Sequence, residues 1–369
     1  MLQPLLGVKV VDLSRVLAGP IAGMILGDLG ADVIKVERPD TGDDSRSWGP
    51  PFDTRGESAY YLSCNRNKLS VAADLDSHAD RELVHRLIAG ADVVIDNFRR
   101  GVLEERGLAP DELIRQYPQL IWCTVTGFGP DRDRPGYDFV VQAESGWMAI
   151  TGEPDGAPMK VGVALVDVLT GRDAAIAVLA ALVGRSNGRE MHRRLHVSLQ
   201  ASAVSALVNV AQNALVTGRD AVRWGNAHAS LVPYELFEAS DRALVIAVGS
   251  DAQFVSLARA LELTALSASR FATNALRVEH RDEVVQAIRG CVASRPAAHW
   301  VDILSAAGVP CGLVRSVLEA LADVEGSALL GVRPPDPSRI RRPPPRLNEH
   351  GAALRARGWK VFAELPVLA

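Results

Sequence analysis

Asp167 is the residue whose surroundings most restrict the chemistry of this sequence. Its carboxyl group stands in the run VGVALVDVLTG at residues 161–171, with aliphatic residues on both sides. Burying an ion costs several kcal/mol unless it is paired or solvated. A carboxylate in this setting therefore indicates a specific role.

Two roles for Asp167 are open from the residues alone. The first is a helix N-cap, because residues 170–173 precede an apolar run at 174–183 and a capping Asp is common at such a boundary. The second is that of a nucleophile, which the positive end of the helix dipole would hold ionised. The two roles are compatible.

Composition favours a globular protein that binds a small molecule. The 369 residues, 48% of them hydrophobic, favour two or three domains with a sizeable core. The formal net charge of −4 gives no global basic field for nucleic acid, so an anionic ligand must meet local cations. Cys64, Cys123, Cys291 and Cys311 lack CxxC spacing, so we expect reduced, buried thiols and no metal site.

The sequence offers no secretory signal, because its first residues lack a basic segment followed by a long apolar core. The most apolar stretch, residues 161–184, is interrupted by Asp167, Arg172 and Asp173, which argues against a simple membrane span. We therefore expect a soluble, cytoplasmic protein that does not insert into a membrane.

Strand and helix patterns alternate in the first half of the chain. The β-rich runs are residues 8–13, 32–37, 92–96 and 120–126, and the helical patterns are residues 20–29, 80–90 and 110–116. Strands joined through helices form right-handed parallel units. The sequence thus predicts a large, doubly wound, Rossmann-like α/β domain.

Glu37 ends the second predicted strand, where a dinucleotide-binding fold often places its ribose-binding acid. The turn after the first strand reads AGPIAG at residues 18–23, without the G-x-G-x-x-G that cradles a pyrophosphate, and Pro20 removes a donor from the helix start. The residues therefore argue against an NAD site.

The second half predicts a smaller α/β domain. Residues 193–197 are predicted to form a strand and 199–216 one long helix. A hairpin is predicted at 234–238 and 243–248. Helices are then predicted at 252–261, 281–292 and 297–306, and a strand near 311–314. The predicted parts are a large domain at 1–195 completed by 346–369, a connecting helix or linker at 196–222, a small domain at 223–321 and a proline-rich return linker at 322–345. Within the last, residues 334–345 are expected to be extended and solvated.

Several motifs, spread over nearly the whole chain, resemble the class III CoA-transferases. Besides the Asp167 run they are DLSRVLAGP at 12–20, LGADVIKVE at 29–37, GD at 42–43 with Trp48, NRNK at 65–68, DNF at 96–98, GFG at 127–129, PGYD at 135–138, QA at 142–143, TG at 151–152, GNAH at 225–228, PY at 233–234 and GVPCG at 308–312. Each is weak alone, and together they are specific.

The resemblance implies that Asp167 is the catalytic nucleophile. In such enzymes the carboxylate attacks an acyl-CoA thioester, the released CoA thiolate reattacks the mixed anhydride to give an aspartyl-CoA thioester, and an acceptor acid takes the CoA. The implied substrates are an acyl-CoA and a carboxylic acid. No ATP, metal or redox cofactor is implied.

Further site residues are carried over by position. The implied CoA-binding residues are Arg38, Asn97, Phe98, Arg106 and Tyr137, and the substrate-pocket candidates are Arg15, Leu17, Trp48, Asn226 and His228. The fork of a guanidinium suits phosphate recognition by Arg38. Open alternatives are an exposed surface arginine for Arg38, a half-buried core tyrosine for Tyr137 and a structural histidine for His228.

The chain departs from its family at several places. Arg99 and Arg100 replace the usual residue-proline pair, Arg15 and Leu17 stand where formyl-CoA transferase carries His and Gln, and residues 248–250 lack that enzyme's glycine run. These departures argue against oxalate as the acceptor. Arg15, after the first strand, is a hypothetical contact for a substrate carboxylate.

Two other function classes stay open. The related α-methylacyl-CoA racemase carries a histidine where Tyr137 and Asp138 stand, and a tyrosine with a pKa of about 10 is a poor general base, so transferase is favoured. A non-catalytic acyl-CoA-binding protein is the other class, against which Asp167 argues. Family members form interlocked homodimers of ring-like chains, so the resemblance implies that assembly.

Overall fold

The computed structural model describes residues 3–132, 134–323 and 340–365, and the chain divides into two compact units. Of the described residues, the first unit holds those up to Met148, Lys160–Arg219 and the segment from 340 onward. The second holds Ala149–Met159 and the residues from Asp220 to 323. The division differs from the predicted boundaries, because residues 196–219 belong to the first unit and 149–159 to the second.

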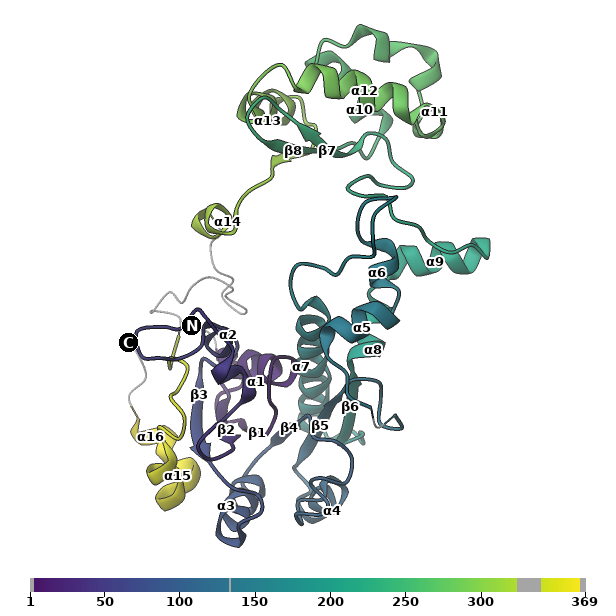
Figure 1. Ribbon diagram of the computed structural model, residues 1–369. Helices are drawn as coiled ribbons and strands as arrows, with labels where there is room; N and C mark the ends of the chain where they lie inside the picture. Colours follow the sequence, from purple (N-terminus) through teal and green to yellow (C-terminus); the bar gives the residue numbers. More distant parts are fainter. Residues whose placement is uncertain (1–2, 133, 324–339, 366–369) are drawn as a thin grey trace. The chain divides into compact units, whose positions relative to one another are not determined.

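The first unit is built on a parallel, six-stranded sheet with the order β3-β2-β1-β4-β5-β6 (Figure 1). The strands are β1 (Lys9–Asp12), β2 (Asp32–Glu37), β3 (Lys68–Ala72), β4 (Val93–Asp96), β5 (Ile121–Thr126) and β6 (Arg194–Ser198). This order confirms the predicted doubly wound, Rossmann-like fold. It reverses between β1 and β4, where ligands of such folds bind beyond the carboxyl ends of the strands.

Helices cover both faces of the sheet. On one face lie α1 (Ala18–Asp28), α7 (Leu165–Ser186) and α8 (Leu199–Ser205); on the other lie α3 (His78–Ala89), α4 (Pro110–Gln116), α15 (Gly351–Arg357) and α16 (Val361–Glu364). Because side chains alternate along a strand, Val10 packs into the first core and Val11 into the second. Burial on both faces explains the continuous apolar runs of these strands.

Shorter helices complete the first unit: η1 (Asp44–Ser47), α2 (Ala59–Ser63), α5 (Asp138–Glu144), α9 (Val208–Thr217) and η5 (Gly358–Lys360). Helix α6 (Trp147–Ile150) spans the boundary between the two units. Strand β3 was not predicted from the sequence. It begins with Lys68, a fully buried charge that forms an ion pair with Asp12. A charged residue inside a short strand hides the apolar pattern on which prediction depends.

The single helix predicted at 199–216 is wrong. The chain forms α8 and α9, bent by 71° at a short break, and Val208 after the break has a positive φ of 41°. Among the described residues no single helix is long and apolar enough to cross a membrane, although this bent pair meets the criterion when its two helices are taken together.

The expectation of a solvated linker is wrong for residues 340–345. Arg341 and Arg342 are buried, and the Arg341 guanidinium donates to the carbonyl oxygens of Gly27 and Ala31 at 2.8 and 2.6 Å. The Arg342 backbone exchanges two hydrogen bonds with Asn67, before β3. This segment is part of the first unit, while residues 334–339 lie outside the described residues.

The second unit contains an antiparallel, three-stranded sheet of β7 (Tyr234–Glu238), β8 (Ala243–Ala247) and β9 (Cys311–Leu313), which confirms the predicted hairpin. Its helices are α10 (Asp251–Ala260), η2 (Thr264–Ser267), η3 (Ser269–Phe271), α11 (Asn274–Glu279), α12 (Arg281–Val292), α13 (Ala297–Ala306) and α14 (Val317–Asp323). Cys291 and Cys311 are only partly buried here, unlike Cys64 and Cys123 in the first unit, so the expectation of four buried thiols is wrong for two.

Candidate active site at the carboxyl edge of the parallel sheet

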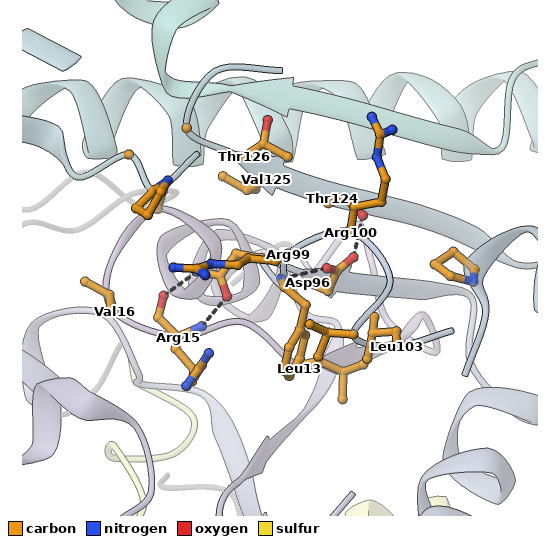
Figure 2. Close-up of a pocket in the computed structure, with 18 of the residues that line it drawn as sticks. Leu13, Arg15, Val16, Asp96, Arg99, Arg100, Leu103, Thr124, Val125 and Thr126 are labelled. Carbon is orange, nitrogen blue, oxygen red and sulfur yellow. Dashed lines mark hydrogen bonds between the residues drawn. The ribbon is translucent and has the colours of Figure 1, made fainter. Parts of the chain in front are cut away.

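A cavity of about 920 Å³ lies in the first unit at the carboxyl ends of β1, β2, β4 and β5 (Figure 2). It occupies the position at which ligands of doubly wound folds bind. The predicted site residues that line it are Arg15, Leu17, Arg38, Asn97, Phe98, Arg106, Tyr137 and Asp167. The topology thus brings together residues that are far apart in the sequence.

Three predicted pocket residues do not line this cavity. The Trp48 ring packs edge-on against Tyr60, with the ring centroids 5.0 Å apart. Asn226 and His228 belong to the second unit, where the His228 ring lies 5.2 Å from the ring of Tyr234. A role for these three residues in the substrate pocket stays a prediction.

The turn between β1 and α1 is held in an unusual conformation. Val16 has a φ of 74°, which is strained for a β-branched residue, and such strain costs about 1–3 kcal/mol. The Val16 N–H donates to both carboxylate oxygens of Asp43, at 3.1 and 3.2 Å. The Asn97 side chain accepts from the Arg15 N–H at 3.0 Å and donates to the Arg15 carbonyl at 2.8 Å. These bonds fix the turn at the edge of the cavity.

A buried network of opposite charges supports that turn from below. Lys35 pairs with Asp43 at 2.9 Å and Lys68 with Asp12 at 2.9 Å, and all four side chains are fully buried. Although burial opposes ionisation, Lys35 lowers the pKa of Asp43 to about 2. These carboxylates therefore stay charged near neutral pH and serve the architecture of the turn.

Glu37 cannot serve as a ribose-binding acid. Its side chain is buried and accepts from the Arg46 guanidinium at 2.7 and 2.9 Å, from Ser70 at 2.6 Å and from the Asp43 N–H at 3.1 Å. Both carboxylate oxygens are thus engaged within the protein. The structure agrees with the inference from the missing glycine fingerprint.

Three of the predicted cations are held in place by acids. The Arg15 guanidinium lies 5.4 Å from the centre of the Phe98 ring and 3.5 Å from Asp44, which also pairs with Arg38. Arg106 pairs with Asp76 at 3.0 Å. All three guanidinium groups are partly exposed, so they can exchange these carboxylates for phosphate oxygens of a ligand.

Asp96, which the sequence analysis did not single out, shapes the loop that carries Asn97 and Phe98. Its buried carboxyl group accepts from the Trp122 indole at 2.7 Å, the Phe98 N–H at 2.9 Å and the Thr124 hydroxyl. Burial raises the pKa of Asp96. The DNF motif therefore begins with a residue that fixes the backbone of the loop at Phe98.

Asp167 lies in the first turn of α7, which begins at Leu165, and its side chain is 9% exposed at the wall of the cavity. Helices α1 and α7 cross closely at Gly171, where an added Cβ would lie 2.6 Å from the Ala18 carbonyl oxygen. Only glycine permits this approach, which brings the start of α7 against the start of α1 and the strained turn.

Asp138 caps α7, so the prediction that Asp167 forms the N-cap is wrong. The Asp138 carboxylate accepts from the backbone N–H groups of Val166 and Asp167, at 2.8 and 3.2 Å. Burial, and then the charge of Asp138, raise the pKa of Asp167 to about 7. The helix dipole was expected to hold Asp167 ionised, and burial beside a second acid has the opposite effect.

Tyr60 is a further neighbour that the sequence analysis missed. Burial, and then the charge of Asp167, raise the pKa of Tyr60, with Asp138 a smaller contributor. The phenol therefore stays protonated near neutral pH, although Tyr60 does not line the cavity itself. Tyr60 lies in none of the motifs, and its contact with the Trp48 ring appears only in the fold.

The doubly wound sheet, with a cavity at its carboxyl edge that is lined by a buried carboxyl group and several arginines, defines the class of α/β proteins that bind ligands beyond the carboxyl ends of their strands. The chain belongs to CoA-transferase family III, whose model matches residues 5–334. It is thus an enzyme of the class III CoA-transferase family, as the motifs predicted.

Similar proteins agree with this assignment. The succinate–glutarate CoA-transferase of Agrobacterium fabrum is 43% identical, over 96% of this chain and 95% of that protein. The succinyl-CoA:glutarate CoA-transferase of Mus musculus is 41% identical, over 88% of this chain and 75% of that protein. The crystal structure of a CAIB/BAIF family protein from Brucella suis is 40% identical, with a TM-score of 0.83 over 96% of this chain and 99% of that one.

Proposed function

We propose that this protein transfers CoA from an acyl-CoA to a carboxylic acid through covalent intermediates on Asp167. A carboxylate oxygen of Asp167 attacks the thioester carbonyl, the C–S bond breaks and the electron pair leaves on the CoA sulfur. The thiolate then attacks the aspartyl carbonyl of the anhydride and releases the donor acid. The acceptor carboxylate attacks the aspartyl thioester, and the returning thiolate completes the exchange.

The observation that carries the proposal is the position of Asp167, a buried carboxyl group at the wall of the cavity in the first turn of α7. A pKa of about 7 leaves a large share of it ionised at neutral pH and makes it more basic than an ordinary aspartate. A more basic carboxylate is a better nucleophile, as long as it is deprotonated. We therefore expect the transfer rate to fall as the pH drops below about 7.

The charged ends of CoA are proposed to lie on the cations of the cavity. Arg38 and Arg106 would bind phosphate groups, with the Asn97–Phe98 loop beside the nucleotide and Tyr137 near the thioester. Each thioester is exchanged for another of similar energy, so the reaction needs no ATP, metal or redox cofactor. Arg15 is proposed to meet a carboxylate of the substrate.

Dicarboxylic acids of four or five carbons are the proposed acids. This choice rests on the succinate and glutarate in the names of two relatives. We further propose that the protein acts in the cytoplasm as a homodimer of interlocked chains. Trp48, Asn226 and His228 are the proposed remaining residues of the substrate pocket.

The test is an exchange assay with succinyl-CoA and glutarate, in which mass spectrometry detects the new thioester. We expect glutaryl-CoA from the wild-type enzyme and a rate lower by at least about a thousandfold from Asp167→Ala, since loss of a nucleophile removes the covalent route. Unchanged exchange by Asp167→Ala would refute the proposal. A panel of mono- and dicarboxylic acids ranks the acceptors.

The racemase alternative is separated by an incubation in heavy water. A 2-methylacyl-CoA without any acceptor acid should take up little deuterium at its α-carbon, because Tyr137 and Asp138 stand in the segment where the racemase is expected to carry its histidine. Rapid uptake would favour the racemase. Hydroxylamine separates the non-catalytic binder. It should convert an aspartyl anhydride or thioester into an aspartyl hydroxamate that changes the mass of the protein, whereas with an inert binder it can react only with the acyl-CoA and the protein mass stays the same.

A further inference from the structure

Asp138 is the second buried carboxyl group at the start of α7, and no motif assigned it a role of its own. We propose that Asp138 is a positioning residue for CoA transfer: it fixes the first turn of α7 and sets a negative charge against Asp167, and acylation of Asp167 relieves the repulsion. The inference rests on the proposed function, in which Asp167 is the nucleophile.

The hydrogen bonds of Asp138 leave its carboxylate little freedom to rotate. One oxygen accepts from the backbone N–H groups of Val166 and Asp167, and the other accepts from the Gln142 amide at 2.6 Å. Gln142 is fully buried, and its own oxygen accepts from the Val161 N–H at 2.9 Å. The network therefore ties α5 to the first turn of α7 and to the segment before it.

Asp138 is also the charge that acts on Asp167. The ionisable side chains on the elements packed against α7 and on the segments beside its start are Arg15, Asp28, Tyr60, Cys123, Asp138, Glu144, Arg194 and His196, and α7 itself adds Arg172, Asp173 and Arg185. In the described part of the first unit none of the cations forms an ion pair with Asp167 or Asp138. Burial and the Asp138 carboxylate are what shift the pKa of Asp167 upward.

The charge balance of the reaction explains why this arrangement assists catalysis. When Asp167 attacks the thioester, its negative charge leaves with the CoA sulfur, and both the anhydride and the aspartyl thioester are neutral. The repulsion between the two carboxylates thus exists in the free enzyme and is absent from each covalent intermediate. Raising the energy of the free carboxylate relative to these states lowers the barrier to acylation.

Asp138→Asn tests the charge separately from the cap, because the amide keeps an oxygen that can accept from the α7 N–H groups. We would measure kcat/KM for CoA exchange against pH, together with the rate of enzyme acylation by intact mass. The acid-side midpoint, at about pH 7 in the wild type, should fall by about one unit in the variant. Relative to each enzyme's own high-pH plateau, the rate at pH 6 would then be about a tenth in the wild type and about a half in the variant. The plateau of the variant should be lower than that of the wild type.

Glu144→Gln is the matched control, since Glu144 lies on the same helix, is exposed and pairs with Arg134. It removes the same charge, and the Glu144 carboxylate accepts from Arg134 rather than from the first turn of α7, so its midpoint should stay at the wild-type value. An Asp138→Asn midpoint equal to that of the control would overturn the inference, whatever happens to the plateau.

Asp138→Glu decides the question if the Asn variant fails to fold. It keeps the charge and misplaces the cap, so we expect an unchanged midpoint with a lower plateau, and a midpoint lowered by a unit would overturn the inference. Failure of the proposed function would look different. The wild type itself would then show neither CoA exchange nor an adduct, whereas failure of the inference leaves an active wild type with a midpoint insensitive to Asp138.

Discussion

Two groups of buried carboxyl groups lie in the first unit, and they differ in their partners. Beneath the β1–α1 turn, Asp12 and Asp43 each contact a lysine, and Glu37 binds Arg46. At the start of α7, Asp138 and Asp167 lie side by side, and neither forms an ion pair within the described part of this unit. One group is neutralised by cations and the other is not.

The difference separates carboxylates that stabilise the fold from the carboxylate that is proposed to react. Lys35 lowers the pKa of Asp43 to about 2 in spite of burial, whereas burial and a neighbouring acid raise the pKa of Asp167 to about 7. A paired carboxylate is unreactive and holds a strained turn. An unpaired one is basic and costs stability when it ionises, which is a common property of active sites.

Lys35→Met should have the largest effect, because it leaves Asp43 buried without its cation. Loss of one partner of a buried pair costs about 3–5 kcal/mol. Urea unfolding at pH 7 would measure the free energy of unfolding. Arg55→Met is the control, since Arg55 pairs with Asp53 at the surface and should lose less than about 1 kcal/mol. Equal losses in the two variants would contradict the contrast between buried and exposed pairs.

Asp167→Asn should stabilise the protein at pH 8. The folded-state pKa of about 7 exceeds the ordinary 3.8, so the wild type loses stability as the pH rises through this window, and the amide does not. We expect a gain of about 2–4 kcal/mol at pH 8 from a shift of this size, and almost none at pH 4.

Unfolding curves at the two pH values measure that gain. An Asn variant that is less stable than the wild type at pH 8 would show that Asp167 is stabilised as an ion, as the paired group is. The variant should also have lost CoA transfer, so that stability and activity change in opposite directions at one side chain.

Ser70→Ala should have the smallest effect. Ser70 donates to Glu37 at 2.6 Å, but the same carboxylate keeps two bonds from Arg46 and one from the Asp43 N–H. The Ser70 hydroxyl also accepts from the Asn348 N–H at 3.0 Å, so the variant loses two hydrogen bonds, and we expect a loss of about 1–2 kcal/mol by urea unfolding. A loss as large as that of Lys35→Met would mean that hydrogen bonds, and not cations, hold the paired group.

The sheet was predictable wherever its strands are buried on both faces, because runs such as residues 92–96 and 120–126 are continuously apolar. Strand β3 was missed because Lys68 forms its ion pair with Asp12, more than fifty positions earlier. The break between α8 and α9 was missed because residues 199–216 contain neither proline nor glycine. Ion pairs between residues far apart in the sequence and local backbone strain do not change the hydrophobic periodicity from which strands and helices are predicted.

The residues of the site were predictable from their resemblance to family motifs more than from capping and charge arguments about single side chains. The motifs identified Asp167, and eight of the eleven predicted site residues line the cavity, but the start of α7 was placed too late, so Asp167 was interpreted as a cap. Asp138 takes that role from a helix 29 positions earlier in the sequence. The effect of Asp138 on the pKa of Asp167 depends on the folded geometry, so it could not be predicted from residues 161–171 alone.

Acylation of Asp167 is the central claim, and intact-mass analysis of the enzyme tests it most directly. Wild-type enzyme loaded with succinyl-CoA at pH 8, without an acceptor acid, should gain the mass of a CoA thioester. Peptide mapping should place that adduct on Asp167, and glutarate should remove it. An enzyme that exchanges CoA at full rate without this adduct, or that carries it on another residue, would contradict the account.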